Sequence, residues 1–330
     1  MNTTGRLFSV TLLGTSRGPG VASVVAGCPA GLPLCEEDFG PDLARRRGGQ
    51  PGTTARAEPD SPRLLAGVFE GRTTGQPLVI AFENTDPGPD GPDHRLLPRP
   101  GHADLAATLK YGGFHDPRGG GAFSGRLTAG LVAAGVIAKR LLPGLLFSAR
   151  VLEVGGRADV DAALAEALAA GDSLGGWLEC RVAGVPAGWG EPLLDPLDGR
   201  LAQVAFSIPG IRAFEIGDGR AIAALRGSET NDPILAADGR AASNRAGGVS
   251  GGISNGNPLV FRVAARPTPS VPLAQRTVRL PGGEPATVST AGRHDACFAL
   301  RLPVVLEAAA AVVLADFARL AGALGPVWAG

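Results

Sequence analysis

The chain has 330 residues, 44% of them hydrophobic, so it is long enough to bury a sizeable core as one large domain or two smaller ones. Its 31 Lys and Arg residues balance its 31 Asp and Glu residues, which argues against attraction to nucleic acid or an anionic membrane. The Gly 50 and Pro 28 content is spread among apolar segments without a period, which excludes a repetitive low-complexity chain and indicates many turns.

Strands are predicted where short apolar runs alternate with polar residues or end at turn residues. Between residues 7 and 12 the alternation stops at Gly14, which indicates a half-buried strand followed by a tight turn. Further strands are expected over residues 64–69, 78–82, 147–154, 177–182 and 259–264.

Three segments have the pattern of helices. Residues 128–142 are apolar around most of the circumference, with basic residues in the last turn and a Pro-Gly pair beyond, which predicts a buried helix. Residues 159–170 begin with a capping aspartate and stop at Gly171, and Pro303 opens a long terminal helix. Strands interspersed with buried helices predict a mixed α+β fold, and no boundary cleanly divides the chain.

Three long segments rich in Gly, Pro and polar residues are predicted to be loops: residues 48–62, 86–98 and 227–256. Loops of this size without structure of their own are uncommon unless they carry function. We therefore expect all three to line a site.

The cysteines and the apolar stretches indicate a soluble, cytoplasmic protein. Cys28, Cys35, Cys180 and Cys297 form no Cys-x-x-Cys pair, so we expect them to be reduced and mostly buried. The first seven residues lack the pattern of a signal peptide. The longest apolar stretch, residues 304–320, is interrupted by charged side chains and falls short of a membrane span.

Several arginines lie in or beside glycine-rich turns rather than opposite acidic residues at helical spacing. They are Arg45, Arg46, Arg47, Arg99, Arg126, Arg266 and Arg293. The guanidinium fork matches phosphate and carboxylate oxygens, so a converging set would suit a small polyanion. Scattered surface arginines are the alternative, and only convergence in space decides between the two.

Two further features could serve a site of this kind. The glycine triplet at residues 119–121 leads into the helix predicted over 128–142 and could present backbone N–H groups to a phosphate, although a plain loop is the alternative. His102 follows an Arg-Pro-Gly turn and could exchange a proton near neutral pH, with a structural histidine as the alternative. His294 adjoins Asp295, and no spacing of His and Cys suggests a metal site.

A series of short motifs occurs in a fixed order along the chain. They include Arg99-Pro100-Gly101-His102-Ala103-Asp104, Lys110-Tyr111-Gly112, Gly251-Gly252-Ile253-Ser254-Asn255-Gly256, Arg266-Pro267-Thr268-Pro269-Ser270 and Gly292-Arg293-His294-Asp295. This order resembles the chorismate synthase family, and the resemblance runs almost end to end, from residue 5 to residue 316.

The resemblance implies a β-α-β sandwich, with central helices between two antiparallel sheets, formed by residues 1–330 as a single domain and assembled as a homotetramer. It implies a lyase that eliminates phosphate in a trans-1,4 fashion from 5-enolpyruvylshikimate 3-phosphate to give chorismate for aromatic amino-acid biosynthesis. Reduced FMN is the implied cofactor, with NADPH or an outside reductant as the source of electrons.

The resemblance also implies roles for particular residues. His102 would stabilise or protonate the reduced flavin, and Asp295 would assist flavin N5 in removing the C6 proton. The residues implied to bind FMN are Ser124, Gly251, Arg266, Pro267, Thr268, Pro269, Ser270 and Arg293. Those implied to face the phosphate and carboxylates of the substrate are Ser16, Arg45, Arg46, Arg126 and again Arg293.

One motif departs from the family pattern. The family's Gly-Glu-Ser-His-Gly reads Gly14-Thr15-Ser16-Arg17-Gly18 here. Arg17 holds its proton too tightly to act as an acid, so we predict that it acts in catalysis by gripping the departing phosphate. The departure leaves open a divergent paralogue acting on a related phosphorylated cyclic substrate, or a flavin-binding relative without lyase activity.

Overall fold

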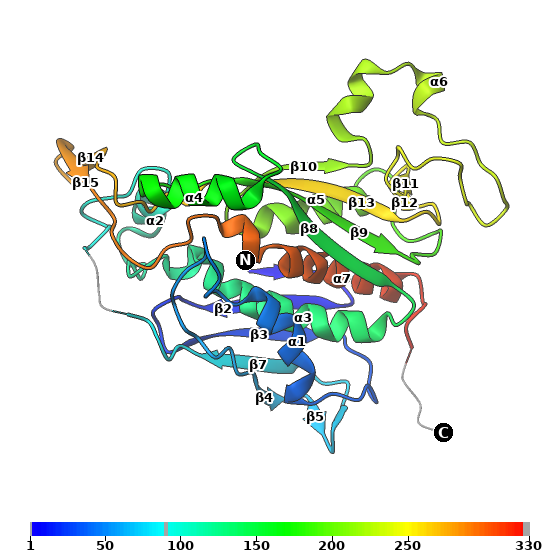
Figure 1. Cartoon of the computed structure of the whole chain (residues 1–330). Helices are drawn as coiled ribbons and strands as arrows, with labels where there is room; N and C mark the ends of the chain where they lie inside the picture. Colours follow the sequence, from blue (N-terminus) through cyan, green and yellow to red (C-terminus); the bar gives the residue numbers. More distant parts are fainter. Residues whose placement is uncertain (1, 89–91, 326–330) are drawn as a thin grey trace.

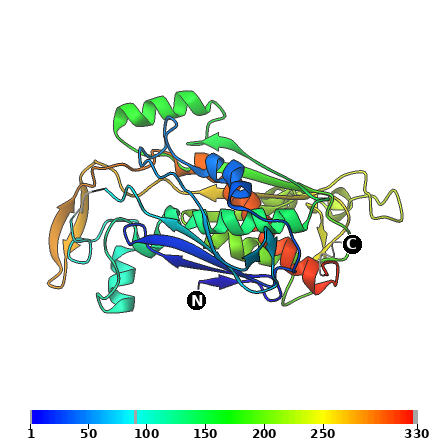
Figure 2. The same cartoon turned by 90° about the horizontal axis from the view of Figure 1, so that it is seen from below.

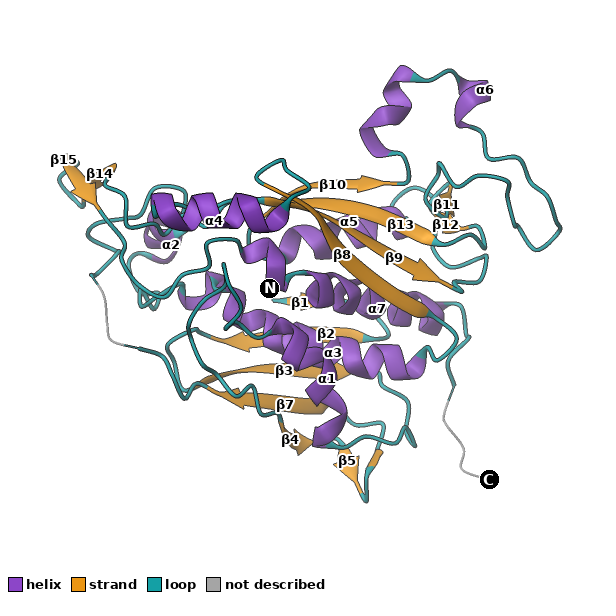
Figure 3. Ribbon diagram, viewed as in Figure 1, coloured by secondary structure: helices purple, strands orange, loops and turns teal. Residues whose placement is uncertain are grey.

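The computed structural model, which describes residues 2–88 and 92–325, has two antiparallel sheets with helices between them (Figures 1 and 3). The first sheet has the order β1 (Thr3–Thr4), β2 (Ser9–Gly14), β3 (Gly20–Ala26), β7 (Leu78–Glu83) and β4 (Arg63–Ala66). The second has the order β10 (Ile211–Ile216), β13 (Leu259–Ala265), β9 (Gly176–Ala183) and β8 (Leu146–Val154). This is the β-α-β sandwich that the resemblance implied.

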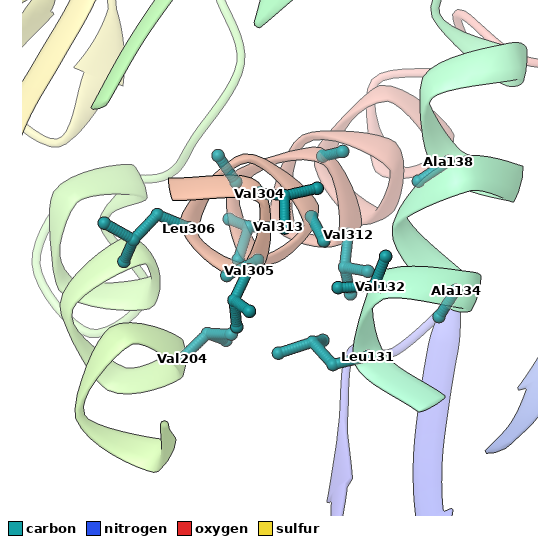
Figure 4. Packing of buried hydrophobic residues seen from close by; sticks show 14 of the residues in the cluster. Leu131, Val132, Ala134, Ala138, Val204, Val304, Val305, Leu306, Val312 and Val313 are labelled. Carbon is teal, nitrogen blue, oxygen red and sulfur yellow. The ribbon is translucent and has the colours of Figure 1, made fainter. Parts of the chain in front are cut away.

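The middle layer is formed by α3 (Thr128–Leu141) and α7 (Pro303–Leu320), which pack on each other. Helix α3 covers the first sheet, whereas α7 covers β8 and β9 of the second and also contacts α5 (Leu197–Ser207). Figure 4 shows Leu131 and Val132 of α3 and Val204 of α5 directed toward the valines of α7. Full burial of such side chains contributes about 1.5–3 kcal/mol each, so this layer supplies a substantial part of the core's stability.

Two acidic side chains are buried in α7, and each is fully engaged. Glu307 accepts hydrogen bonds from both terminal nitrogens of Arg45, at 2.8 and 2.6 Å, and from Lys139 Nζ at 2.9 Å. Asp316 Oδ1 accepts from three successive backbone N–H groups of residues 6–8, at 2.9, 2.7 and 2.9 Å. Paired in this way, the charges tie the helix to the rest of the fold. In the described part of the chain, no helix is both long and apolar enough to cross a bilayer.

Shorter elements surround the sandwich. The remaining helices are α1 (Gly40–Arg46), α2 (Asp104–Tyr111), α4 (Val160–Ala170) and α6 (Gly227–Thr230), with 3₁₀ turns η1 (Glu36–Phe39), η2 (Gly121–Phe123), η3 (Gly125–Leu127), η4 (Gly219–Ala224) and η5 (Phe298–Arg301). The remaining strand pairs are β5 (Val68–Phe69) with β6 (Arg72–Thr73), β11 (Val249–Ser250) with β12 (Ile253–Ser254), and β14 (Gln275–Arg279) with β15 (Glu284–Val288). Helix α2 and the β14–β15 hairpin lie at one end of the molecule, and the segment carrying α6 extends from the other (Figures 1 and 2).

The predicted elements are confirmed, with shifted boundaries. The strand expected from residue 7 begins at Ser9 and runs to Gly14. The strand expected over residues 64–69 is divided into β4 and β5 at Gly67, whose φ of +87° suits glycine. Helix α4 starts where predicted, because the Asp159 carboxylate accepts the N–H of Ala162 at 3.0 Å.

Some elements were missed. Strand β3 alternates small residues with valines, so its periodicity is weak, and α1, α2, α5 and β10 lie in segments for which no element was predicted. All four cysteines are free, and three of them are buried, whereas Cys35 is exposed.

Candidate active site

A cavity of about 880 Å³ opens at the end of the sandwich where α3 and β10 begin. Its size is in the range of small-molecule sites. The wall is built from segments that are distant in sequence: residues 16–17, 46–48, 87–88, 99, 101–103, 119–120, 122–126, 206–212, 266–270 and 291–295, together with residues 54, 56, 58, 60, 298 and 301.

Most of the predicted site residues meet in this cavity. Its lining includes Ser16, Arg17, Arg46, His102, Ser124, Arg126, Arg266, Pro267, Thr268, Pro269, Ser270, Arg293 and Asp295. Arg47 and Arg99 line it as well. The arginines noted in the sequence are therefore gathered around one space rather than scattered over the surface, with Arg45 as the exception.

Two predicted residues lie elsewhere in this chain. The Arg45 guanidinium binds Glu307 of α7 and does not line the cavity, whereas its neighbour Arg46 does. Gly251 lies in the turn between β11 and β12 and is not part of the cavity wall. The expectation that residues 227–256 line a site is wrong for this cavity, because that segment follows β10 toward the opposite end of the sandwich (Figure 1). The loops at 48–62 and 86–98 do contribute to the wall.

The glycine triplet lets two side chains approach its backbone. Gly119 has φ of +60°, and a Cβ placed there would lie 3.0 Å from Arg17 Nε and 3.1 Å from Ser16 Oγ. Ser124 follows as the N-cap of η3, where its Oγ accepts the N–H of Arg126 at 3.1 Å. The turn therefore places Ser16, Arg17 and Arg126 along one wall of the cavity.

Arg99 forms a buried ion pair and also contacts two other segments of the wall. Its Nε and Nη2 donate to the two oxygens of Asp104 at 2.7 and 2.8 Å. Its Nη1 reaches Ser270 Oγ at 3.2 Å, and its Nη2 reaches the carbonyl of Gly119 at 2.7 Å. The same Asp104 lies 2.5 Å from His102 Nδ1. Burial alone would raise the pKa of Asp104, but the bonds from Arg99 and His102 outweigh it and hold this pKa well below its usual value.

Arg46 and Arg126 share a second buried carboxylate. Asp60 Oδ2 accepts from Arg46 Nη2, and Asp60 Oδ1 accepts from Arg126 Nη1. Burial lowers the pKa of Arg46 to about 10, with Asp60 opposing this effect, so the guanidinium stays charged at neutral pH. Arg126 is held further by Asn84, whose Oδ1 accepts from its Nε at 2.8 Å.

Asp295 is fixed from two directions. Its Oδ1 accepts the backbone N–H of Thr54 at 2.9 Å, and its Oδ2 pairs with Arg301 Nη1 at 3.2 Å. The neighbouring Arg293 pairs with Asp86, through Nη1 to Oδ2 at 2.5 Å and Nη2 to Oδ1 at 2.9 Å. Arg293 is the main reason why the pKa of Asp86 falls to about 2.

The cavity also contains residues that the sequence did not single out. Phe206, Ile208 and Phe298 give it an apolar side. His294 lines it too, and desolvation, followed by the charge of Arg99, lowers the pKa of this imidazole. Only the adjacency of His294 to Asp295 hinted at a role for it. The apolar residues lie in segments without any local signal.

The wall holds a buried polar atom without a protein partner. Among the described residues, Thr268 Oγ1 has no hydrogen-bond partner although it is buried, and a bound group could satisfy it. Across residues 2–88 and 92–325, no three His, Cys, Asp or Glu side chains gather in a way that could hold a metal ion.

The chain is similar to known proteins over nearly its whole length. A family model described as chorismate synthase matches residues 8–318. A curated chorismate synthase from Chitinophaga pinensis is 54% identical over 322 residues, which cover 97% of each chain, and one from Ignicoccus hospitalis is 43% identical over 357 residues, covering 99% of this chain and 94% of the relative. A solved chorismate synthase crystal structure superposes with a TM-score of 0.75 at 28% identity, covering 98% of this chain and 94% of the other.

Proposed function

The chain belongs to the chorismate synthase family, and from this premise we propose that its cavity binds reduced FMN and 5-enolpyruvylshikimate 3-phosphate together. Membership gives the chain chorismate synthase activity, the reaction of a lyase on a small phosphate-bearing molecule in aromatic biosynthesis. The observation that carries the proposal is the meeting of the arginines, His102 and Asp295 around one space of about 880 Å³. Several cations there match a substrate with a phosphate and two carboxylates.

The wall fits a flavin with a phosphate tail. The apolar side formed by Phe206 and Phe298 suits a planar ring system, and the unpartnered Oγ1 of Thr268 suits a polar atom of the cofactor. Ser124, Ser270, Arg266 and Arg293, with the Pro-Thr-Pro segment at 267–269, would hold the remaining polar groups. When bound, reduced FMN supplies an electron transiently, with no net oxidation.

His102 can hold a proton beside a negatively charged cofactor. Its Nδ1 lies 2.5 Å from Asp104 Oδ1, so this carboxylate orients the ring at the cavity wall. Arg99 fixes the orientation of Asp104 from the other side. We assign His102 the role of stabilising or protonating the reduced flavin.

Asp295 is positioned to assist removal of the C6 proton. The N–H of Thr54 and the guanidinium of Arg301 hold its carboxylate in one orientation at the cavity wall. A carboxylate fixed in one rotamer can accept a proton, or hold the group that accepts it, without first having to reorient.

The departing phosphate needs cations rather than a strong acid. We assign Ser16, Arg17, Arg46 and Arg126 to the phosphate and carboxylates of the substrate, because all four line the same wall. Donors fixed in advance stabilise charge as it develops on the leaving group. Arg45 and Gly251 lie outside this wall, and their assignments stay predictions.

We also propose a cytoplasmic homotetramer formed by single-domain chains of residues 1–330. The source of electrons would be NADPH or an outside reductant. Sedimentation of the purified protein measures the oligomeric state, and flavin reduction by NADPH under anaerobic conditions tests the source of electrons.

The test of the function is an anaerobic assay with reduced FMN and 5-enolpyruvylshikimate 3-phosphate, following chorismate absorbance and phosphate release together. We expect equal amounts of both products. His102→Ala and Asp295→Ala should each lower the rate by about 10²–10⁴-fold, as expected for loss of an acid–base group. FMN binding without release of either product would contradict the proposal.

A further inference from the structure

Asp60 lies at the cavity wall but has the wrong charge for an anionic ligand. Its side chain is 0% exposed, and its backbone has φ of +49°, which is uncommon for a residue other than glycine. Both of its carboxylate oxygens are occupied by cavity arginines. We propose that Asp60 is a positioning residue that holds Arg46 and Arg126 as one two-pronged clamp for a phosphate or carboxylate group, an inference that rests on the proposed function.

The two arginines depend on Asp60 to different degrees. Arg126 has further fixed partners, since its Nε donates to Asn84 Oδ1 at 2.8 Å and its Nη2 to the carbonyl of Glu83 at 3.1 Å. Within the described part of the chain, the Arg46 guanidinium has only a long contact to Thr128 Oγ1, at 3.5 Å, besides Asp60. Its Nε is buried and has no partner among the described residues. Loss of Asp60 should therefore disorder Arg46 more than Arg126.

Asp60 also keeps two like charges together. Arg46 and Arg126 are each 3% exposed at the side chain, so solvent screens their mutual repulsion only weakly. One carboxylate between two guanidiniums leaves a net charge of one cation at this point. The ligand must then approach the remaining N–H groups of the two arginines, because the oxygens of Asp60 repel it.

Charge and positioning give opposite expectations for Asp60→Asn. If the acid only subtracts charge, its removal leaves two full cations, and an anion should bind more tightly. If it positions them, the anion should bind more weakly, because the guanidiniums separate. Whether Asp60→Asn raises or lowers the affinity for the anion therefore decides between the charge role and the positioning role.

The experiment measures the affinity for inorganic phosphate by calorimetry, together with kcat and KM for the substrate. Asp60→Asn should raise the phosphate Kd and lower kcat/KM by about 30-fold, which corresponds to about 2 kcal/mol, the lower range for breaking a buried charge pair. Asp60→Glu keeps the charge and should recover part of the loss. It also provides a second variant should the amide fail to fold.

Glu307→Gln is the matched control. Glu307 is likewise a buried carboxylate between two cations, Arg45 and Lys139, but it lies outside the cavity. We expect this variant to lose thermal stability and to keep the phosphate Kd within about twofold of the wild type, since Glu307 does not line the cavity. A similar loss of affinity in both variants would overturn the proposal.

The failure of this inference can be distinguished from failure of the proposed function. Unchanged or tighter phosphate binding by folded Asp60→Asn would overturn the positioning role. If the wild type binds phosphate but releases neither chorismate nor phosphate from the substrate, the proposed function fails. In that case the phosphate Kd of the variants still tests Asp60.

Discussion

Replacing Asp104 by Asn tests the link between the Arg99 ion pair and His102. Asp104 accepts hydrogen bonds from the N, Nε and Nη2 atoms of Arg99 at 3.0, 2.7 and 2.8 Å, and lies 2.5 Å from His102 Nδ1. Each oxygen serves two of these donors. The amide of Asn has a single acceptor oxygen, so its NH₂ group must take the place of one carboxylate oxygen. That group faces two donors and cannot accept from them, so at least two hydrogen bonds are lost.

The magnitude follows from these bonds. Hydrogen bonds to a charged group contribute about 1.5–3 kcal/mol each, so two lost bonds lower the free energy of unfolding by about 3–6 kcal/mol. For a chain of 330 residues, 1 kcal/mol corresponds to roughly 1.5 °C in Tm, so we expect a fall of about 4–9 °C. The loss should exceed that of a surface substitution several-fold.

The pH dependence has a definite sign. The folded-state pKa of Asp104 is held below its unfolded value, so its contribution to stability is complete above the unfolded pKa of about 3.9 and is lost as the pH falls toward the folded pKa. Asp104→Asn should lack this acid-induced loss below about pH 4. Without the Asp104 carboxylate, the His102 ring loses its charged partner at Nδ1 and is held less firmly at the cavity wall, so kcat for chorismate formation should fall as well.

The assay combines thermal unfolding between pH 2.5 and 8 with kcat for chorismate formation at neutral pH. Glu307→Gln provides a control with comparable loss of buried bonds away from the cavity, and should lower Tm without a comparable fall in kcat. An Asp104→Asn protein with the Tm and the kcat of the wild type would refute the reasoning.

Three other predictions concern single positions. Arg17→His should preserve or raise the rate of chorismate formation, because it restores an acid at the anion site, and loss of activity would contradict the view of Arg17 as a partial substitute. Gly135→Ala should lower the free energy of unfolding by about 1–3 kcal/mol in a denaturant titration, because the new Cβ would lie 2.3 Å from Ala308 Cβ. Gly130→Ala on the same helix is the control, since its new Cβ meets its nearest atom at 3.2 Å and should destabilise the protein less. A larger loss of stability in Gly130→Ala would contradict this prediction. Asp86, with its pKa at about 2, should contribute stability that is present above about pH 4 and lost from there down to pH 2, and Asp86→Asn should remove this dependence from thermal unfolding.

The sequence predicted the elements of the sandwich better than it predicted the details of the wall. Alternation and capping are local signals, so α4 and most long strands were found, but β3 was missed because its small residues give a weak period. The triplet at residues 45–47 shows the limit at the site. Arg45 and Arg46 are neighbours on α1, about 100° apart around the axis, so one reaches Glu307 and the other the cavity.

Asp60 could not be predicted from its surroundings in the sequence. An acidic residue in a polar loop is normally exposed, and its burial here depends on α1 and on η3 before α3, which lie far from it in the chain. The roles read from the family resemblance placed the arginines at the site but gave no information on the carboxylates behind them. Such partners follow from the packing of distant segments.

Both central helices begin beside the cavity. Ser124 and Arg126 precede the first turn of α3, and Phe298 and Arg301 precede that of α7. Aligned peptide dipoles give each helix N-terminus the equivalent of about half a positive charge. The hydrophobic layer that stabilises the sandwich therefore also directs two electropositive ends at the cavity, and their attraction for an anion would persist when any one arginine is replaced.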